Sequence, residues 1–169
     1  EYSFGTQLGF YGQYLNFYYD SGKDGGLGTE IDFTGGFDIT DSFFLGINAA
    51  YDTNSNRIVD VEGTELGATT GFYGVALYPQ IATSDSFSLG LRGEYFSVFN
   101  DGLADVIGLD NQGDGNVIAT TLSGKYTIGA LTLIPEIRTD LTSEDFFIDK
   151  DREATKSLSS FVLGAVYTF

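Results

Sequence analysis

The sequence predicts an all-β fold, an eight-stranded antiparallel up-and-down transmembrane β-barrel with long extracellular loops and short periplasmic turns. Three observations support this prediction. Apolar and polar residues alternate with a period of two along most of the 169 residues, which is the pattern of strands with one apolar face. The connections alternate between long and short. The apolar faces of the expected strands carry no Asp, Glu, Lys or Arg, and a charge facing lipid at mid-bilayer would cost about 2–4 kcal/mol.

Eight segments follow the period of two: 7–18, 29–39, 43–52, 72–82, 87–96, 117–128, 131–139 and 158–169. Long connections are expected near 20–28, 53–66, 97–116 and 141–156, and short turns near 40–42, 83–86 and 129–130. An even number of strands that starts and ends on the short-turn side places both termini in the periplasm. Pro79 and Pro135 fall inside expected strands and lack the N–H donor of a ladder, so we expect a local bulge at each.

The charged residues of the strands share the opposite parity, which would face the lumen. They form the expected lumenal charge network, which comprises Arg92, Glu94, Lys125, Glu136, Arg138, Glu30 and Asp32. Counted from the short turns, Arg92 and Glu136 are both sixth in their strands, and Glu94 and Arg138 are both eighth. One strand separates these two strands, so the side chains could meet as complementary pairs. A soluble sandwich would also explain the alternation, but not the asymmetry of the loops.

Two interpretations of this network remain open. Eight strands enclose an interior that side chains can fill, so the charges could form a salt-bridged plug. Alternatively, they could form a charged constriction through which solutes pass. Closure at eight strands favours the plug.

Composition excludes several classes of function. The sequence has no His and no Cys, which removes histidine general bases, thiolate nucleophiles and zinc-thiolate sites. We therefore expect no enzyme and no cofactor. The formal net charge of −16 argues against a nucleic-acid partner. The loops are acidic, and Asp110, Asp114 and Asn116 superficially resemble a calcium loop, but the segment lacks the closing bidentate Glu of an EF-hand, and a flexible solvated loop is the favoured interpretation.

The end of the chain predicts an assembly signal. Apolar residues step back by two from a terminal aromatic residue: Phe161, Leu163, Ala165, Tyr167 and Phe169. The pattern looks like the terminal signal that the barrel-assembly machinery recognises, with Phe161, Leu163, Tyr167 and Phe169 as its main residues. Aromatic residues also gather at the expected strand ends as two interfacial rings. The turn-side ring would hold Phe37, Phe43, Phe87, Tyr126, Tyr167 and Phe169, and the loop-side ring Tyr14, Tyr18, Tyr51, Tyr73, Tyr95 and Phe161.

Several segments resemble one protein family. They are residues 71–78 (GFYGVALY), 91–96 (LRGEYF) and 131–140 (LTLIPEIRTD), together with Phe146-Phe147 and the terminal Tyr167-Thr168-Phe169. These segments are similar to the OmpL-like beta-barrel porin family of Gram-negative bacteria, mainly over residues 71–169. The resemblance implies a location in the outer membrane and a pore function. Members of that family are longer and have more strands, so residues 1–169 are either one small barrel domain or the C-terminal portion of a larger barrel.

Two functions follow as alternatives. The first is a small structural or interaction barrel with a filled lumen, such as an accessory subunit whose acidic loops meet lipopolysaccharide or other outer-membrane proteins. The second is a porin, or a portion of one, that passes small solutes or ions through a charged lumen. Either protein would have outer-membrane lipid and the barrel-assembly machinery as partners.

Overall fold

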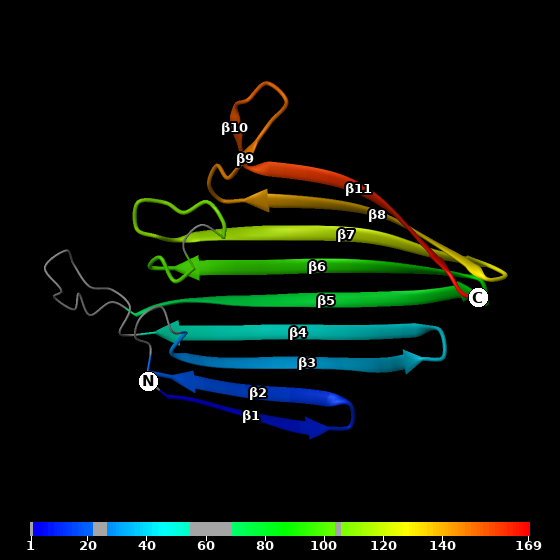
Figure 1. Ribbon diagram of the computed structural model, residues 1–169, viewed down its shortest axis with the longest axis horizontal. Helices are drawn as coiled ribbons and strands as arrows, with labels where there is room; N and C mark the ends of the chain where they lie inside the picture. Colours follow the sequence, from blue (N-terminus) through cyan, green and yellow to red (C-terminus); the bar gives the residue numbers. More distant parts are fainter. Residues whose placement is uncertain (1, 22–26, 55–68, 104–105) are drawn as a thin grey trace, which may run out of the picture.

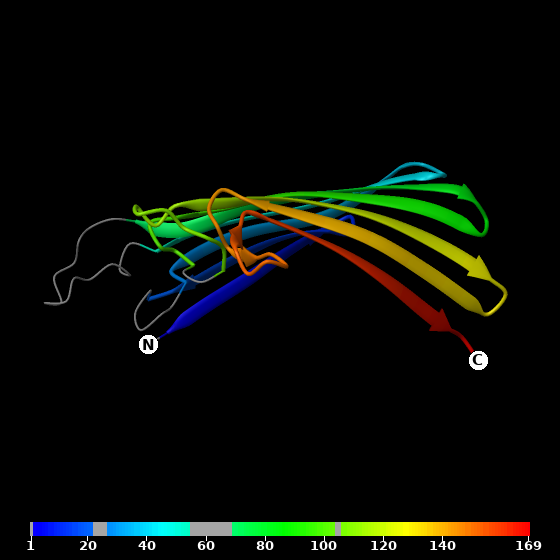
Figure 2. The same cartoon turned by 90° about the horizontal axis from the view of Figure 1, so that it is seen from above.

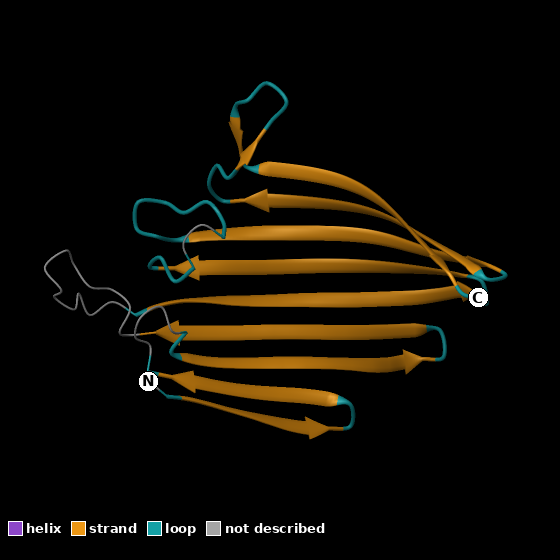
Figure 3. Ribbon diagram, viewed as in Figure 1, coloured by secondary structure: helices purple, strands orange, loops and turns teal. Residues whose placement is uncertain are grey.

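The computed structural model describes residues 2–21, 27–54, 69–103 and 106–169, and these form one antiparallel meander (Figure 1). Its strands are β1 (Ser3–Phe10), β2 (Gln13–Asp20), β3 (Thr29–Thr40), β4 (Phe43–Asn54), β5 (Thr70–Ser84), β6 (Phe87–Phe99), β7 (Gly115–Ile128), β8 (Leu131–Thr142) and β11 (Ser157–Tyr167). A small separate hairpin joins β9 (Phe147–Ile148) to β10 (Ala154–Thr155). Strands and connections account for the whole described chain (Figure 3), which contains no helix able to span a membrane.

The strand expected at residues 7–18 is a hairpin, which corrects the prediction of eight strands. β1 and β2 pair around a tight turn at Tyr11 and Gly12, which have φ angles of 47° and 77°. Two consecutive residues with positive φ characterise the type I′ turns that suit two-residue hairpin loops. The sheet therefore contains nine strands in the described residues, and the prediction of an eight-stranded closed barrel is not confirmed.

The sheet is strongly curved and open (Figure 2). In the described part of the chain, β1 and β11 are its two edges and do not pair with each other. The long connections gather at one end of the strands and the short turns at the other, as expected, although residues 22–26, 55–68 and 104–105 of the long loops lie outside the described residues. The N end lies with the long loops and the C end with the turns (Figure 1), so the structure does not support the prediction that both ends lie on the turn side.

Exposure identifies the concave face. On β7, Ile118 and Leu122 are each 51% exposed, whereas Ala119 and Thr121 between them are 2% and 4% exposed. Side chains crowd together on the inside of a curved sheet and spread apart on its outside. The polar parity therefore lines the concave face and the apolar parity covers the convex face, as the alternation predicted.

Successive strands are displaced along one another in a constant direction. One row of directly opposed residues crosses the sheet through Tyr14, Thr34, Asn48, Ala76, Glu94, Ala119, Asp140 and Leu158. β2, β4, β6 and β8 each begin just after a short turn, and the number of residues between the start of the strand and this row increases from β2 to β8. These strands begin at Gln13, Phe43, Phe87 and Leu131. The displacement is roughly one residue per strand, which is the stagger that accompanies the strand tilt of about 35–45° in barrels.

The aromatic residues of the convex face follow this stagger. Tyr51 and Phe43 of β4, Tyr95 and Phe87 of β6, and Phe161 and Phe169 near β11 are pairs separated by eight positions. Eight residues span about 26 Å along a strand, or about 20 Å of membrane thickness at that tilt, close to the apolar band of outer-membrane barrels. Tyr14 and Tyr18 do not join the loop-side ring, because they lie opposite Thr34 and Glu30 on the concave face.

The two prolines do not create the expected bulges. Pro79 lies opposite Leu45 of β4, and Pro135 lies opposite Leu163 of β11. On the other side of each proline the ladder is interrupted, but the register is unchanged when pairing resumes, as shown by Leu77↔Gly93 and Gln80↔Gly90, and by Ser123↔Glu136 and Tyr126↔Leu133. Each strand therefore accommodates the missing donor without an inserted residue.

Candidate functional site

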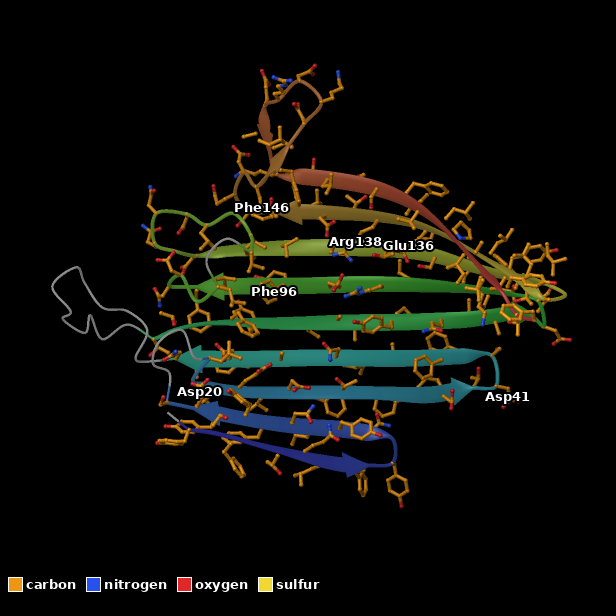
Figure 4. The ribbon with its side chains drawn as sticks, in the orientation of Figure 1. Asp20, Asp41, Phe96, Glu136, Arg138 and Phe146 are labelled. Carbon is orange, nitrogen blue, oxygen red and sulfur yellow. The ribbon has the colours of Figure 1, made fainter. Side chains whose placement is uncertain are left out.

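The concave face of β6 to β8 holds a four-residue ion-pair network. Arg138 Nη1 lies 2.7 Å from Glu94 Oε2, and Arg138 Nη2 lies 2.7 Å from Asp140 Oδ1. The other oxygen of Glu94 pairs with Arg92. Arg138 lies near the middle of β8 (Figure 4). Glu94 is thus shared by two guanidinium groups, which fixes these long side chains against one wall.

The register explains why the network spans two strands that are not neighbours. Arg92, Thr121 and Arg138 lie in one row, and Glu94, Ala119 and Asp140 lie in the next. Adjacent strands are about 4.8 Å apart, so the charged groups of β6 and β8 must reach across β7. The small side chains of Ala119 and Thr121 leave the room for this contact, and the network covers them.

The predicted network is brought together only in part. The structure joins Arg92, Glu94 and Arg138, but the pair expected between Arg92 and Glu136 is absent among the described residues. Glu136 instead accepts a 2.8 Å hydrogen bond from the Ser123 hydroxyl. The stagger places Glu136 two positions beyond Arg92, since Ser123 and Gly90 are the residues in its row. Asp140 is not among the residues predicted from the sequence, because the expected strand ends at residue 139, although Asp140 has the same parity as Glu136 and Arg138.

A hollow of about 280 Å³ lies beside the network. Polar and charged side chains contribute much of its wall: Tyr78, Gln80, Arg92, Ser123, Lys125 and Glu136. The guanidinium carbon of Arg92 lies 5.3 Å from the centre of the Tyr78 ring, a cation–π contact. Within the described residues, no ion pair involves Lys125, which is exposed on the same face. Lys125 lies toward the turn end, as predicted.

Charge is distributed unevenly over the concave face. The register assigns five carboxylates of β2 to β4 to this face: Asp20, Glu30, Asp32, Asp38 and Asp52. Asp32 accepts a 2.8 Å hydrogen bond from Asn16, which in turn accepts one of 2.7 Å from Gln7. The three basic residues of the described strands, Arg92, Lys125 and Arg138, all lie on β6 to β8. Glu30 and Asp32 therefore form a separate acidic wall and are not part of the ion-pair network.

The residues predicted as weak calcium candidates, Asp110, Asp114 and Asn116, make hydrogen bonds that hold the conformation of their own loop. The Asp110 carboxylate accepts hydrogen bonds of 2.8 Å from the backbone N–H of Gln112 and 3.0 Å from the backbone N–H of Asp114. The Asp114 carboxylate accepts one of 2.9 Å from the backbone N–H of Asn100. The backbone N–H of Asn116 donates to the Ser143 hydroxyl. Across the described ranges, no group of three or more His, Cys, Asp or Glu side chains is placed to hold a metal ion.

The expected assembly-signal residues line the convex side of the last strand. Phe161, Leu163 and Tyr167 of β11 lie opposite Ile137, Pro135 and Leu131 of β8. All three side chains are more than half exposed, as is Phe169 beyond the strand. They form one continuous apolar and aromatic stripe on the edge strand of the sheet.

Comparison with known proteins identifies the family. A family model described as putative beta-barrel porin-2, OmpL-like, matches residues 1–169. The chain belongs to this family. The resemblance predicted mainly over residues 71–169 is thus confirmed and extends over the entire sequence. No curated protein matches the chain.

A solved structure supports the same fold. The structure titled as the NanC porin in a rhombohedral crystal form has a TM-score of 0.52 to this chain at 13% sequence identity, covering 99% of this chain and 78% of that one. At this identity the likeness shows the fold alone. Family and fold together indicate a porin-type β-barrel protein of the Gram-negative outer membrane.

Proposed function

We propose that this protein is a porin whose water-filled lumen is lined by the concave face of the sheet. One observation carries the proposal: the described strands place their charged residues on the concave face and leave the convex face apolar. Lipid therefore meets an uncharged surface, while water and solutes meet carboxylates, guanidinium groups and hydroxyls.

The sequence alone favours a filled lumen, because the eight strands that it predicts would enclose little space. Nine strands in an open curve remove the basis for that preference. The ion-pair network lies flat along β6 to β8 and leaves the hollow around Lys125 and Glu136 beside it. An accessory-subunit role stays a prediction without further support, and the porin is the function that the geometry supports best.

The distribution of charge favours cations. The register places five carboxylates of β2 to β4 on the concave face without a basic residue on those described strands, and the opposite wall pairs its two arginines with Glu94 and Asp140. Carboxylates along a narrow aqueous passage raise the local concentration of cations. The acidic loops would strengthen this effect at the extracellular mouth.

Planar-bilayer recording on the full-length protein tests this function. We expect discrete conductance steps, and a reversal potential in a potassium chloride gradient that shows a preference for cations. The double variant Glu30→Gln/Asp32→Asn should reduce this preference, because it removes two lumenal charges. Asp41→Asn is the matched control, since Asp41 lies in the β3–β4 turn (Figure 4). Absence of conductance steps would contradict the porin, and a preference for anions would contradict the proposed acidic wall.

We also propose the partners of the two outer surfaces. The apolar convex face would contact the acyl chains of the outer membrane, and the acidic loops would meet lipopolysaccharide through bridging divalent cations. The stripe of Phe161, Leu163, Tyr167 and Phe169 would be recognised by the barrel-assembly machinery. The exposed, charge-free character of the convex side chains supports the contacts with lipid and with the assembly machinery.

A further inference from the structure

The two edges of the sheet are incompatible with its surroundings in a membrane. β1 and β11 contain eight and eleven residues, and in the part of the chain that the structure describes no strand pairs with their outer sides. Each backbone N–H or C=O left without a partner in hydrocarbon costs several kcal/mol, so membrane-spanning sheets close without an edge. Some strand must therefore pair with each edge in the assembled protein.

Strand direction restricts what that partner can be. β1 runs from the loop end to the turn end, because Ser3 lies opposite Asp20 and Phe10 lies opposite Gln13. β11 runs the same way, because Ser157 lies opposite Leu141 and Tyr167 lies opposite Leu131. If β1 and β11 paired directly, they would form a parallel seam. Bacterial single-chain outer-membrane barrels are antiparallel throughout and have an even number of strands.

A second copy of the same chain cannot remove this conflict. Two copies in one membrane share the same orientation, with their long loops on the same side. All four edges then run from the loop end to the turn end, and any pairing between copies is again parallel. An antiparallel closure requires an odd number of further strands between β11 and β1.

The similar solved structure indicates how many strands are missing. The nine strands of this chain correspond to 78% of the NanC porin chain, so about a fifth of that porin has no counterpart in residues 1–169. In proportion, this remainder corresponds to between two and three strands. Three is the odd number that satisfies both constraints.

We propose that the nine strands of the described sheet belong to a twelve-stranded barrel, which three further strands in series close by pairing with β1 and β11. These strands belong to the same polypeptide and lie outside residues 1–169. The stagger of roughly one residue per strand continues through them, as closure requires. The proposal rests on the membrane location and deepens the proposed function, because twelve strands enclose a wider lumen than eight.

Cysteine cross-linking in the full-length protein tests this arrangement, and residues 1–169 contribute no native cysteine. One cysteine replaces Leu8 of β1 and a second replaces Leu163, Ala165 or Tyr167 of β11 in turn. These positions cover the part of β11 that the stagger would bring beside Leu8 in a nine-stranded barrel. The control pair is Leu133→Cys with Ala165→Cys, because these residues lie directly opposite each other in β8 and β11.

We expect the control pair to form a disulfide and the β1–β11 pairs to form at least about tenfold less, because three intervening strands exceed the reach of a disulfide. Hydrogen exchange should show the amides of both β1 and β11 protected as strongly as those of β5. A cross-link within one chain would overturn the proposal in favour of nine-stranded closure, and a cross-link between chains would overturn it in favour of a second copy. Rapid exchange at either edge would show that edge to be unpaired and would also overturn the proposal. Neither readout depends on conductance, so this proposal and the porin function can fail separately.

Discussion

Arg138 makes two ion pairs of the lumenal network, as does Glu94. Its guanidinium binds Glu94 on β6 and Asp140 on its own strand, and a third partner, Arg92, joins through Glu94. The side chains of Arg138 and Glu94 are 31% and 19% exposed, so the pair is neither fully buried nor fully solvated. The strength of this pair therefore reports how much water reaches the lumen.

A double-mutant cycle with Arg138→Ala and Glu94→Gln measures that strength. In a water-filled lumen we expect a coupling free energy of about 1 kcal/mol or less, since solvent screens the pair. Lys125→Met is the control, because Lys125 is exposed and makes no ion pair within the described residues, and it should change the free energy of unfolding only slightly. A coupling of about 3–5 kcal/mol would indicate a dry, plugged interior and contradict the porin.

The composition of the ion-pair network was only partly predictable from the sequence. The parity of Glu94 and Arg138 placed them on one face, and counting from the turns placed them at one depth. Counting could not include the stagger between strands, which is a property of the whole sheet. For this reason the sequence predicts a pair between Arg92 and Glu136, whereas the structure pairs Arg92 with Glu94. Asp140 was missed because the end of a strand is poorly marked in sequence.

At the scale of the strands, the convex face must remain free of charge. Leu122 and Ser123 are neighbours on β7 that lie on the convex and the concave face respectively. Leu122→Arg should lower the stability of the folded barrel by about 2–4 kcal/mol, because the charge enters the apolar band. Ser123→Arg should be tolerated, since its side chain enters the lumen beside Glu136. Folded fractions measured by the gel shift between unboiled and boiled protein compare the two, and equal losses would refute the assigned faces.

The last strand should carry information for assembly in addition to its packing. Deletion of Phe169, or Tyr167→Asp, should reduce the amount of protein in the outer membrane while synthesis is unchanged, because each interrupts the apolar stripe. Thr168→Asp provides the matched control, since Thr168 has the opposite parity within the same segment. Membrane levels measured by fractionation and immunoblotting should fall only in the first two variants. Wild-type levels in all three would remove the assembly signal.

Seven of the nine strands could be predicted because each pairs a clear alternation with a marked connection. The β1–β2 hairpin could not, because its turn is Tyr11-Gly12 and lacks the Asn, Asp, Ser or Pro that usually marks a turn. The available signal was a change of apolar parity, from Leu8 and Phe10 before the turn to Leu15 and Phe17 after it. These apolar residues can lie on one face of the sheet only if the chain reverses direction between Phe10 and Leu15, as it does in the β1–β2 hairpin.

At the scale of the whole molecule, the curvature of the sheet, the stagger of its strands and the difference between its two faces are all features of a barrel wall. The sheet curves so that charge lies inside, and each strand is displaced along its neighbour as in a tilted barrel. The sequence could not predict this shape, because strand count and stagger are properties of pairing and not of local pattern. Because the described sheet has an odd number of strands, its two edge strands β1 and β11 run in the same direction and cannot pair antiparallel with each other.

If the protein is a porin, lipid meets the convex face and water meets the concave face, and spin labelling along β7 distinguishes the two surroundings. Single cysteines at positions 118, 120 and 122 and at 121, 123 and 125 would carry the label in the full-length protein in lipid vesicles. We predict that labels at the first three positions collide with oxygen dissolved in lipid and not with a water-soluble nickel chelate, and that the last three show the opposite. If labels at 121, 123 and 125 were reached by neither agent, the lumen would be filled. If labels at 118, 120 and 122 were shielded from both, the apolar face would be buried in protein, and the assignment of that face to lipid would be wrong.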